Sequence, residues 1–124
     1  MSQTTVLIVE DEPALRDIYL RVMQKQVWRI CEARDGEQAI ACLQDTTPDL
    51  IFLDMLLPHV SGLQVLQYIA SKPHLCKAHV VMVSSSQEYA RYTSLLPSCE
   101  FYLKPILPSQ IQEIILRFSE KLPR

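Results

Sequence analysis

Two short apolar runs in this chain each end abruptly in carboxylates. In the run LIVEDEP, Glu10, Asp11 and Glu12 follow directly after apolar residues, and a second apolar run ends in Asp54. Apolar runs of this length, bounded by polar residues, are typical of buried strands. In a parallel α/β sheet the ligand crevice lies outside the carboxyl ends of adjacent strands. The sequence therefore predicts a cluster of carboxylates at one edge of a sheet.

Strand-like runs alternate with amphipathic segments along the whole chain. The predicted strands are about Thr5–Val9, Trp28–Glu32, Leu50–Leu53, His79–Val83 and Phe101–Leu103. The predicted helices are one that begins at Pro13, then about Gly36–Leu43, Gly62–Ala70 and Glu88–Leu96, and a last one that begins at Pro108. Such alternation, repeated five times, predicts an α/β fold with a parallel sheet and helices on both faces.

Composition narrows the class of protein. The chain has 124 residues, which fits one domain, and a net charge of −2 with no cluster of Lys and Arg, so we expect no direct binding to nucleic acid. Apolar stretches fall well short of the roughly 20 residues of a membrane span. Without a basic leader and apolar core at the start, the expected location is the cytoplasm. The cysteines have no CxxC spacing and are expected to be free thiols. They are Cys31, Cys42, Cys76 and Cys99.

The clustered carboxylates suggest a divalent cation. If the first and third strands are neighbours, Asp54 faces Glu10 and Asp11. Their mutual repulsion is relieved by a hard cation with oxygen ligands, and Mg²⁺ suits a site with one or two carboxylates and several waters. Because side chains alternate along a strand, one of Glu10 and Asp11 should point at the cation and the other should approach through water.

Two further polar groups are expected at the same edge. Lys104 follows the fifth predicted strand, where its ammonium group can offset the carboxylates or bind a phosphoryl oxygen. The peptide bond between Lys104 and Pro105 is a candidate for the cis form. Ser84 ends the fourth predicted strand and brings a hydroxyl group. Serine in this position is also typical of a loop or a helix N-cap.

Five blocks, in order, resemble the receiver (CheY-like) domain of bacterial two-component response regulators. The blocks are LIVEDEP, EARDGEQA, PDLIFLDMLLPHVSG, VVMVSSS and FYLKP, and they cover the whole chain. Pro58 and Gly62 match the family's Asp-x-x-x-Pro-x-x-x-Gly loop. The resemblance implies a single receiver domain over residues 1–124. It also implies a flavodoxin-like (CheY-like) fold, with a five-stranded parallel sheet in the order 2-1-3-4-5.

The resemblance also implies a function. Asp54 would accept a phosphoryl group from a histidine kinase or phosphotransfer protein in a Mg²⁺-dependent reaction. The domain would then change conformation and signal to an output partner or effector domain. Such a domain is a switch rather than an enzyme, because it catalyses only its own phosphoryl transfer and slow dephosphorylation.

Roles for individual residues follow from the same resemblance. Asp11, Asp54 and the backbone carbonyl of Leu56 would bind Mg²⁺, with Glu10 acting through water. Lys104 would pair with the phosphate. Ser84 and Phe101 would form the conformational switch, and Leu56 and Ser86 would tune the lifetime of the phosphoryl group. Because Phe101 has no hydroxyl group to satisfy, we expect it to face inward even before phosphorylation.

The chain departs from the family pattern around the fourth helix. The interval from Ser84 to Lys104 is about two residues short, and Pro97-Ser98-Cys99 replaces the usual Ala-Gly-Ala. Only Glu100 remains of the acidic pair that precedes the switch aromatic in the winged-helix DNA-binding subfamily, so that subfamily's dimer is not expected.

Other classes of protein fit less well. A phosphatase of the haloacid dehalogenase type needs an acid two residues after its nucleophile, and Leu56 stands there. A flavodoxin-like redox carrier needs a loop rich in hydroxyl groups and glycine, but LIVEDEP offers carboxylates. A receiver fold that no longer accepts phosphate is disfavoured by the presence of Glu10, Asp11, Asp54, Ser84 and Lys104.

Overall fold

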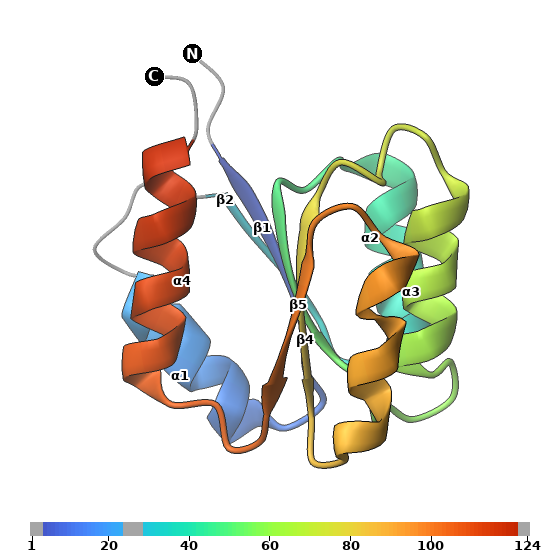
Figure 1. The fold of residues 1–124 in the computed structure, drawn as a ribbon. Helices are drawn as coiled ribbons and strands as arrows, with labels where there is room; N and C mark the ends of the chain where they lie inside the picture. The colour runs from blue at the N-terminus through green and yellow to red at the C-terminus, as the bar shows by residue number, and fades with distance from the viewer. Residues whose placement is uncertain (1–3, 24–28, 122–124) are drawn as a thin grey trace.

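The computed structural model describes residues 4–23 and 29–121. They form one five-stranded parallel sheet in the order β2-β1-β3-β4-β5 (Figure 1). The strands are β1 (Thr5–Val9), β2 (Arg29–Ala33), β3 (Leu50–Asp54), β4 (His79–Ser84) and β5 (Cys99–Leu103). The expected fold class and strand order are therefore confirmed.

The strand boundaries differ from the predicted ones by one or two residues. Strand β3 includes Asp54 and β4 includes Ser84, so both polar residues belong to the sheet itself. Strand β5 begins at Cys99 rather than Phe101, because the Ser98 carbonyl already accepts a hydrogen bond from the amide of Val80. Trp28, predicted to start the second strand, lies outside the described residues.

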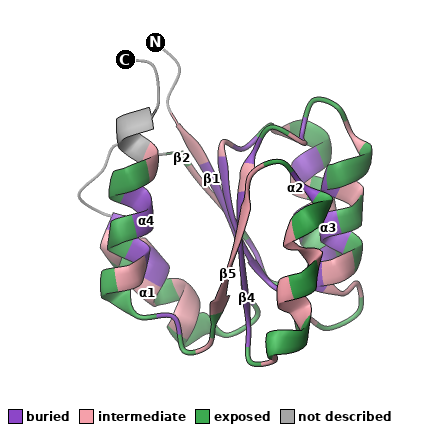
Figure 2. Ribbon diagram, viewed as in Figure 1, coloured by how far each residue is buried: buried purple, intermediate pink, exposed green. Residues whose placement is uncertain are grey.

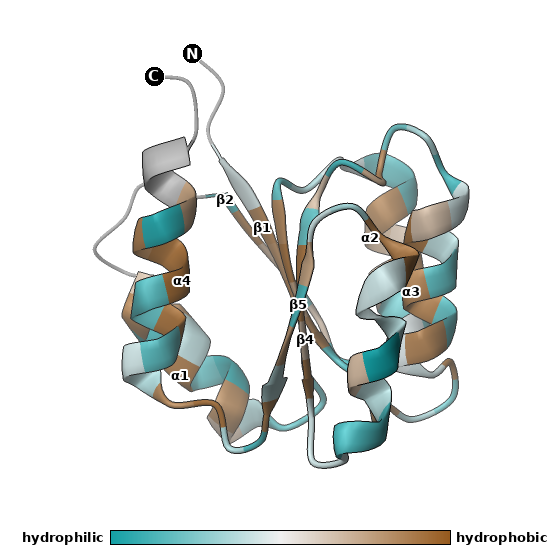
Figure 3. Cartoon of the chain, viewed as in Figure 1, coloured by the Kyte–Doolittle hydropathy of each residue, from teal (hydrophilic) through white to brown (hydrophobic). Residues whose placement is uncertain are grey.

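Helices cover both faces of the sheet. α1 (Pro13–Met23) and α4 (Pro108–Lys121) lie on one face, and α2 (Gly36–Asp45), α3 (Gly62–Ser71) and the 3₁₀ helix η1 (Gln87–Leu95) lie on the other (Figure 1). Side chains of β1 alternate between two cores: Val6 and Ile8 pack toward α1 and α4, and Leu7 and Val9 toward α2 and α3. Burial on both faces explains why the central strands are continuously apolar. Figures 2 and 3 show the buried, hydrophobic strands between helices of mixed polarity.

Local sequence signals define where the helices begin. The Asp35 side chain accepts a hydrogen bond from the Gln38 amide at 2.8 Å and caps α2. Ser61 and Gln64 form a reciprocal capping box at the start of α3, with bonds of 3.2 and 3.0 Å. Each cap satisfies backbone amides that the first helical turn leaves unpaired.

The prediction of a fourth α-helix is wrong, because this segment forms a 3₁₀ helix. Residues 87–95 form a 3₁₀ helix in which no residue is buried. Thr93 and Ser94 donate side-chain hydrogen bonds to the carbonyls of Ala90 and Arg91, three residues earlier. Hydroxyl groups that bond locally compete with the α-helical ladder, and the segment has little apolar surface to oppose them. The shortened interval noticed in the sequence thus corresponds to a tighter helix.

The four cysteines are free thiols. Among the residues that the structure describes, no helix has the length and apolar character needed to cross a membrane.

Candidate functional site

Four polar residues meet at the carboxyl ends of neighbouring strands. Glu10 follows β1, Asp54 ends β3, Ser84 ends β4 and Lys104 follows β5. Parallel pairing aligns them, since β3 lies between β1 and β4 in the sheet. The edge at which the sequence predicted a site is therefore the edge at which these side chains converge.

The ammonium group of Lys104 joins the carboxylates. Its Nζ lies 3.0 Å from Asp54 Oδ2, 3.5 Å from Glu10 Oε1 and 3.8 Å from Glu12 Oε1. The Lys104–Pro105 peptide bond is cis, as the sequence suggested. Burial alone would lower the pKa of Lys104, but the hydrogen bond to Asp54 and the surrounding carboxylates raise it above its ordinary value. Lys104 is thus a fixed positive charge in this site.

Asp54 is a buried carboxylate with both oxygens engaged. It is 3% exposed, its Oδ1 accepts a hydrogen bond of 3.0 Å from the Leu56 amide, and its Oδ2 faces Lys104. Burial raises the pKa of Asp54 and the charge of Asp11 adds to that, while the Leu56 amide and Lys104 oppose the rise. Two donors therefore hold the carboxylate in position in a site that otherwise disfavours its charge.

Glu10 is even more deeply buried than Asp54. Its side chain is 1% exposed, and Oε2 accepts a hydrogen bond of 3.1 Å from the Glu12 amide. Burial, followed by the nearby charge of Asp54, raises the pKa of Glu10 to about 7. Near neutral pH, having Glu10 and Asp54 both ionised in the same buried site therefore costs electrostatic free energy.

The acidic loop brings together donors suited to a hard cation. One carboxylate oxygen from each of Glu10, Asp11 and Glu12 lies within 4.8 Å of the others. Oxygen donors in this number fit a Mg²⁺ or Mn²⁺ ion that keeps several waters. Among the described acidic side chains, Asp54 is not part of this compact group, and its oxygens bond to Lys104 and to the Leu56 amide; the Leu56 ligand would be a backbone carbonyl. Their predicted role as ligands stays a prediction.

Sequence reasoning missed two contributors. Glu12 belongs to the acidic group and approaches Lys104, yet it was not chosen as a ligand although it stands in the same run of acids. Arg16 donates from Nη1 to the carbonyl of Glu10 at 2.8 Å and to that of Asp11 at 3.3 Å. Arg16 therefore holds the acidic loop from the first turns of α1, a role that nothing in the linear sequence signals.

The remaining predicted residues surround this cluster. Ser84 is fully buried, and its Oγ accepts a hydrogen bond of 3.1 Å from the Ser86 amide. Leu56 is 49% exposed beside Asp54, which leaves its side chain free to contact an incoming group. Phe101 is only partly buried and packs against the core under α2 and α3, so it is less enclosed than the sequence led us to expect.

Gly62 fixes the loop after Asp54. A Cβ atom at this position would lie 2.5 Å from the Asp54 carbonyl oxygen and 2.4 Å from Met55 Cα. No side chain fits at these distances, so the match of Gly62 to the loop motif has a steric reason. The amino end of α3 thereby packs directly against the chain that carries the acid.

Known proteins share this arrangement. Residues 6–116 match the family model of the response regulator receiver domain. The chain is 32% identical over 120 residues to the probable transcriptional regulatory protein TcrX of Mycobacterium tuberculosis, a match that covers 97% of this chain and 50% of TcrX. It spans about half the length of the curated relatives it matches.

Solved structures agree with the sequence comparison. The bacteriophytochrome response regulator AtBRR superposes with a TM-score of 0.79 at 29% identity, covering 100% of this chain and 98% of that chain. The Mn²⁺-bound form of response regulator Rcp1 gives a TM-score of 0.82 at 26% identity, covering 97% of both chains. From the family model, the sheet order and the buried acid beside a lysine, we conclude that this chain belongs to the response regulator receiver domain family.

Proposed function

We propose that this chain is a phosphorylatable switch in which Asp54 accepts a phosphoryl group. The observation that carries the proposal is the Asp54 carboxylate, buried at a strand end and held 3.0 Å from the Lys104 ammonium. A carboxylate is a competent nucleophile when it is positioned and deprotonated. Burial raises the pKa of Asp54, and the Leu56 amide and Lys104 oppose that rise while they hold the carboxylate in position.

The reaction is an in-line displacement at phosphorus. An oxygen of Asp54 forms a bond to the phosphorus atom of a phosphohistidine, and the phosphorus–nitrogen bond breaks. The electron pair of that bond leaves with the imidazole, which takes up a proton. Lys104 bonds an equatorial oxygen and offsets the charge that develops there. The product is an acyl phosphate, which adds about one negative charge at the end of β3.

A divalent cation, Mg²⁺ by preference, would complete the charge balance. Glu10, Asp11 and Glu12 supply the compact oxygen cluster, and Asp54 and the Leu56 carbonyl are the further ligands that the family pattern implies. When bound, the cation would supply positive charge to the phosphoryl oxygens. Removing one carboxylate should weaken its binding and at the same time relieve repulsion in the metal-free site.

Ser84 and Phe101 are the proposed readout. The buried Ser84 oxygen accepts a hydrogen bond from the Ser86 amide, and a phosphoryl oxygen on Asp54 would give the Ser84 hydroxyl a new acceptor for its own proton. Movement of Ser84 would change the space next to Phe101, which is now partly buried against the core. Phosphorylation would then shift a pre-existing equilibrium rather than create a new fold.

The proposed partners follow from this chemistry. A histidine kinase or a phosphotransfer protein would donate the phosphoryl group, and an output partner or effector domain would recognise the altered face. The proposed location is the cytoplasm. Leu56 and Ser86, next to Asp54 and Ser84, would set how fast water removes the phosphoryl group in slow self-dephosphorylation.

The proposal is tested by phosphorylating the protein with acetyl phosphate and Mg²⁺. Intact-protein mass spectrometry should detect one added phosphoryl group that hydroxylamine removes, as expected of an acyl phosphate. Asp54→Asn should remain unlabelled, and the matched control Asp49→Asn at the other end of β3 should still be labelled. Labelling of Asp54→Asn would refute the assignment.

The cation is tested by thermal melts with EDTA and with Mg²⁺. Asp11→Asn should melt at a higher temperature than the wild type in EDTA and gain less from Mg²⁺. Asp17→Asn in α1 keeps the charge change but lies outside the acidic loop, and it should respond to Mg²⁺ as the wild type does. Equal Mg²⁺ stabilisation of Asp11→Asn and wild type would contradict the ligand role.

A further inference from the structure

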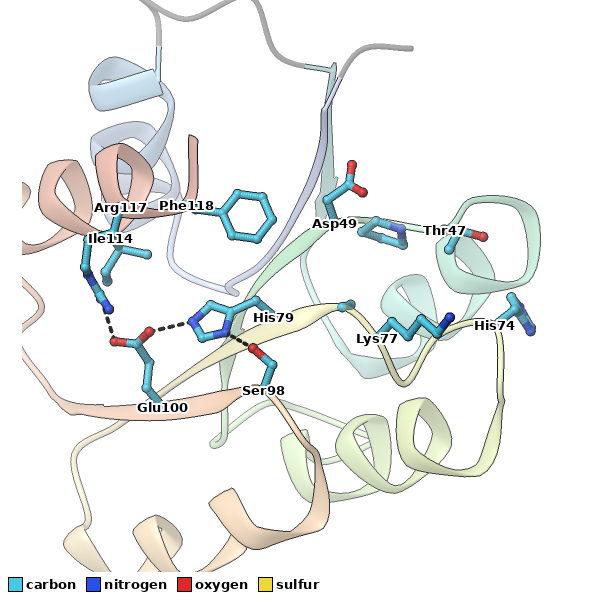
Figure 4. Close-up of a pocket in the computed structure, with 12 residues that line it drawn as sticks. Thr47, Asp49, His74, Lys77, His79, Ser98, Glu100, Ile114, Arg117 and Phe118 are labelled. Carbon is cyan, nitrogen blue, oxygen red and sulfur yellow. Dashed lines mark hydrogen bonds and ion pairs between the residues drawn. The ribbon is translucent and has the colours of Figure 1, made fainter. Parts of the chain in front are cut away.

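A pocket of about 380 Å³ opens at the end of the sheet opposite Asp54 (Figure 4). Its walls come from the amino-terminal ends of β4 and β5, from α4, and from the loops that precede β3 and β4. His79 begins β4 and pairs with Leu50, whereas Asp54 lies four residues further along β3. At about 3.3 Å per residue the two sites are about 13 Å apart. The pocket volume falls in the range of about 300–1,000 Å³ that is usual for small-molecule sites.

One wall of the pocket is polar, but its polar groups already form hydrogen bonds with one another. Glu100 Oε1 accepts a hydrogen bond of 2.9 Å from Arg117, and Glu100 Oε2 bonds to His79 Nε2. The other ring nitrogen of His79 bonds to Ser98 Oγ. These contacts tie β4, β5 and α4 together and leave the His79 ring with a fixed orientation. Glu100 has no charge left to offer a cationic ligand, because Arg117 neutralises it.

The lining next to this wall contains two aromatic rings and several aliphatic groups. The Phe118 ring lies over the His79 ring, with centroids 6.2 Å apart and an interplanar angle of 27°. Ile114 and Ala78 are 1% and 4% exposed, and Pro48 is buried beside them. Two nearly parallel rings bordered by aliphatic groups favour a planar, apolar ligand body.

The opposite side of the pocket carries a lysine and a histidine that reach solvent. Lys77 and His74 are exposed, and within the described part of the chain neither has a hydrogen-bond or ion-pair partner. Figure 4 places them across the pocket from Glu100 and Arg117. The second acid of the lining, Asp49, accepts a hydrogen bond of 2.9 Å from the Thr5 amide. This bond holds the Asp49 carboxylate without neutralising it, and among the described lining residues Lys77 is the cation that has no ion-pair partner.

We propose that this pocket binds small aromatic carboxylates, with the ring against Phe118 and His79 and the carboxylate toward Lys77. The hydrogen-bonded wall gives the pocket a fixed shape, and the apolar lining buries the ring of the ligand. Lys77 favours a ligand that carries a negative charge. This site is separate from the phosphoryl acceptor and does not depend on its function. It would give the domain a small-molecule input at the end of the sheet that phosphorylation does not use.

The proposal is tested by titrating the ¹⁵N-labelled protein with naphthalene-2-carboxylate, naphthalene-2-carboxamide and acetate. The carboxylate should cause saturable shifts in the amides of His79, Ser98 and Glu100, and little change at Asp54. The carboxamide should bind about 2–5-fold more weakly, because an exposed ion pair contributes about 0.2–1 kcal/mol. Acetate should not saturate, since it lacks a ring.

Variants separate the charge from the ring. Lys77→Gln should weaken the carboxylate about 2–5-fold and leave the carboxamide unchanged. Lys72→Gln, in the same loop but outside the pocket lining, is the matched control and should bind both probes as the wild type does. Phe118→Leu keeps an apolar side chain but removes the ring, and should weaken both probes.

Three results would overturn the proposal. Absence of saturable shifts around His79 with the carboxylate would show that the pocket is not a site for this class. Equal affinity for carboxylate and carboxamide would remove the role of Lys77. An equal loss in Lys72→Gln and Lys77→Gln would mean that only the general surface charge attracts the anion.

Discussion

The two ends of the sheet carry charged clusters that differ in how far basic side chains match the acidic ones. At the carboxyl end, Lys104 is the one described cation that forms ion pairs with the buried carboxylates of Glu10 and Asp54 and with the more exposed Glu12. The pKa values of both buried acids are raised, chiefly by burial and also by a neighbouring charge, that of Asp54 for Glu10 and that of Asp11 for Asp54. Negative charge at this end exceeds what the protein can neutralise by itself.

At the amino end the partly buried acid is matched by its partners. Glu100 lies between Arg117 and His79, and although burial opposes it, these partners hold the pKa of Glu100 below its ordinary range. Buried and partly buried acidic residues therefore play different roles, depending on how many hydrogen-bonding or basic partners each one has. A cluster with an excess of carboxylates favours binding of a metal cation, whereas a cluster whose charges are paired holds strands and a helix together.

The largest effect is expected from removing the cation that contacts Asp54 at the carboxyl end. Lys104→Met should slow phosphorylation by acetyl phosphate about 100-fold, since a single positioned donor to a developing charge contributes on this scale. Mass spectrometry of the phosphorylated fraction against time measures it. Lys72→Met, on the surface after α3, is the control and should react at the wild-type rate. A rate for Lys104→Met within threefold of wild type would remove the distinction between the two ends.

The next largest effect is expected on stability, from removing the charge of Glu10 at the carboxyl end of the sheet. Because folding raises the pKa of Glu10 from 4.5 to about 7, the folded state binds the proton more tightly, and stability falls as pH rises through that window. In EDTA near pH 7.5, Glu10→Gln should therefore raise the free energy of unfolding by about 1–3 kcal/mol. The gain should vanish toward pH 4.5, the lower end of that window. Urea unfolding at both pH values measures it, and a loss of stability near pH 7.5 would contradict the account.

The matched end should respond with the opposite sign. Folding lowers the pKa of Glu100, so its contribution to stability is complete above the unfolded value of 4.5 and is lost as pH falls through the folded value. Glu100→Gln should thus lower the free energy of unfolding by about 1 kcal/mol near pH 7 and by less in acid. Glu113→Gln in α4 serves as the control. If Glu100→Gln stabilised the protein, the two ends would not differ as described.

The smallest effect concerns the lifetime of the phosphoryl group. The half-exposed Leu56 side chain can hinder water at Asp54 but cannot orient it. Leu56→Asn should shorten the half-life of phospho-Asp54 about threefold, as expected for one hydrogen bond to the attacking water. Decay of the phosphorylated mass after removal of acetyl phosphate measures it. A half-life that is unchanged or longer would argue against shielding by Leu56.

Much of the fold was predictable from local patterns. Continuous apolar runs identified the central strands β1, β3 and β4, which are buried on both faces, and period-3.6 patterns located the helices on either side. The fourth helix was the exception, because its apolar residues are too few to impose a type. Hydrogen bonds made by Thr93 and Ser94 in the folded chain, rather than periodicity, distinguish the 3₁₀ form.

What the sequence determined by itself was which residues stand at the strand ends, because strand length and polarity are local properties. Only the tertiary structure decided which of these residues meet. Lys104 reaches Glu10 and Asp54 from far along the chain because β3 lies between β1 and β4. The anchoring of the acidic loop by Arg16, and the pocket between His79 and Phe118, likewise arise from packing between separate elements. Contacts of this kind depend on distance in space, and a linear pattern carries no measure of that distance.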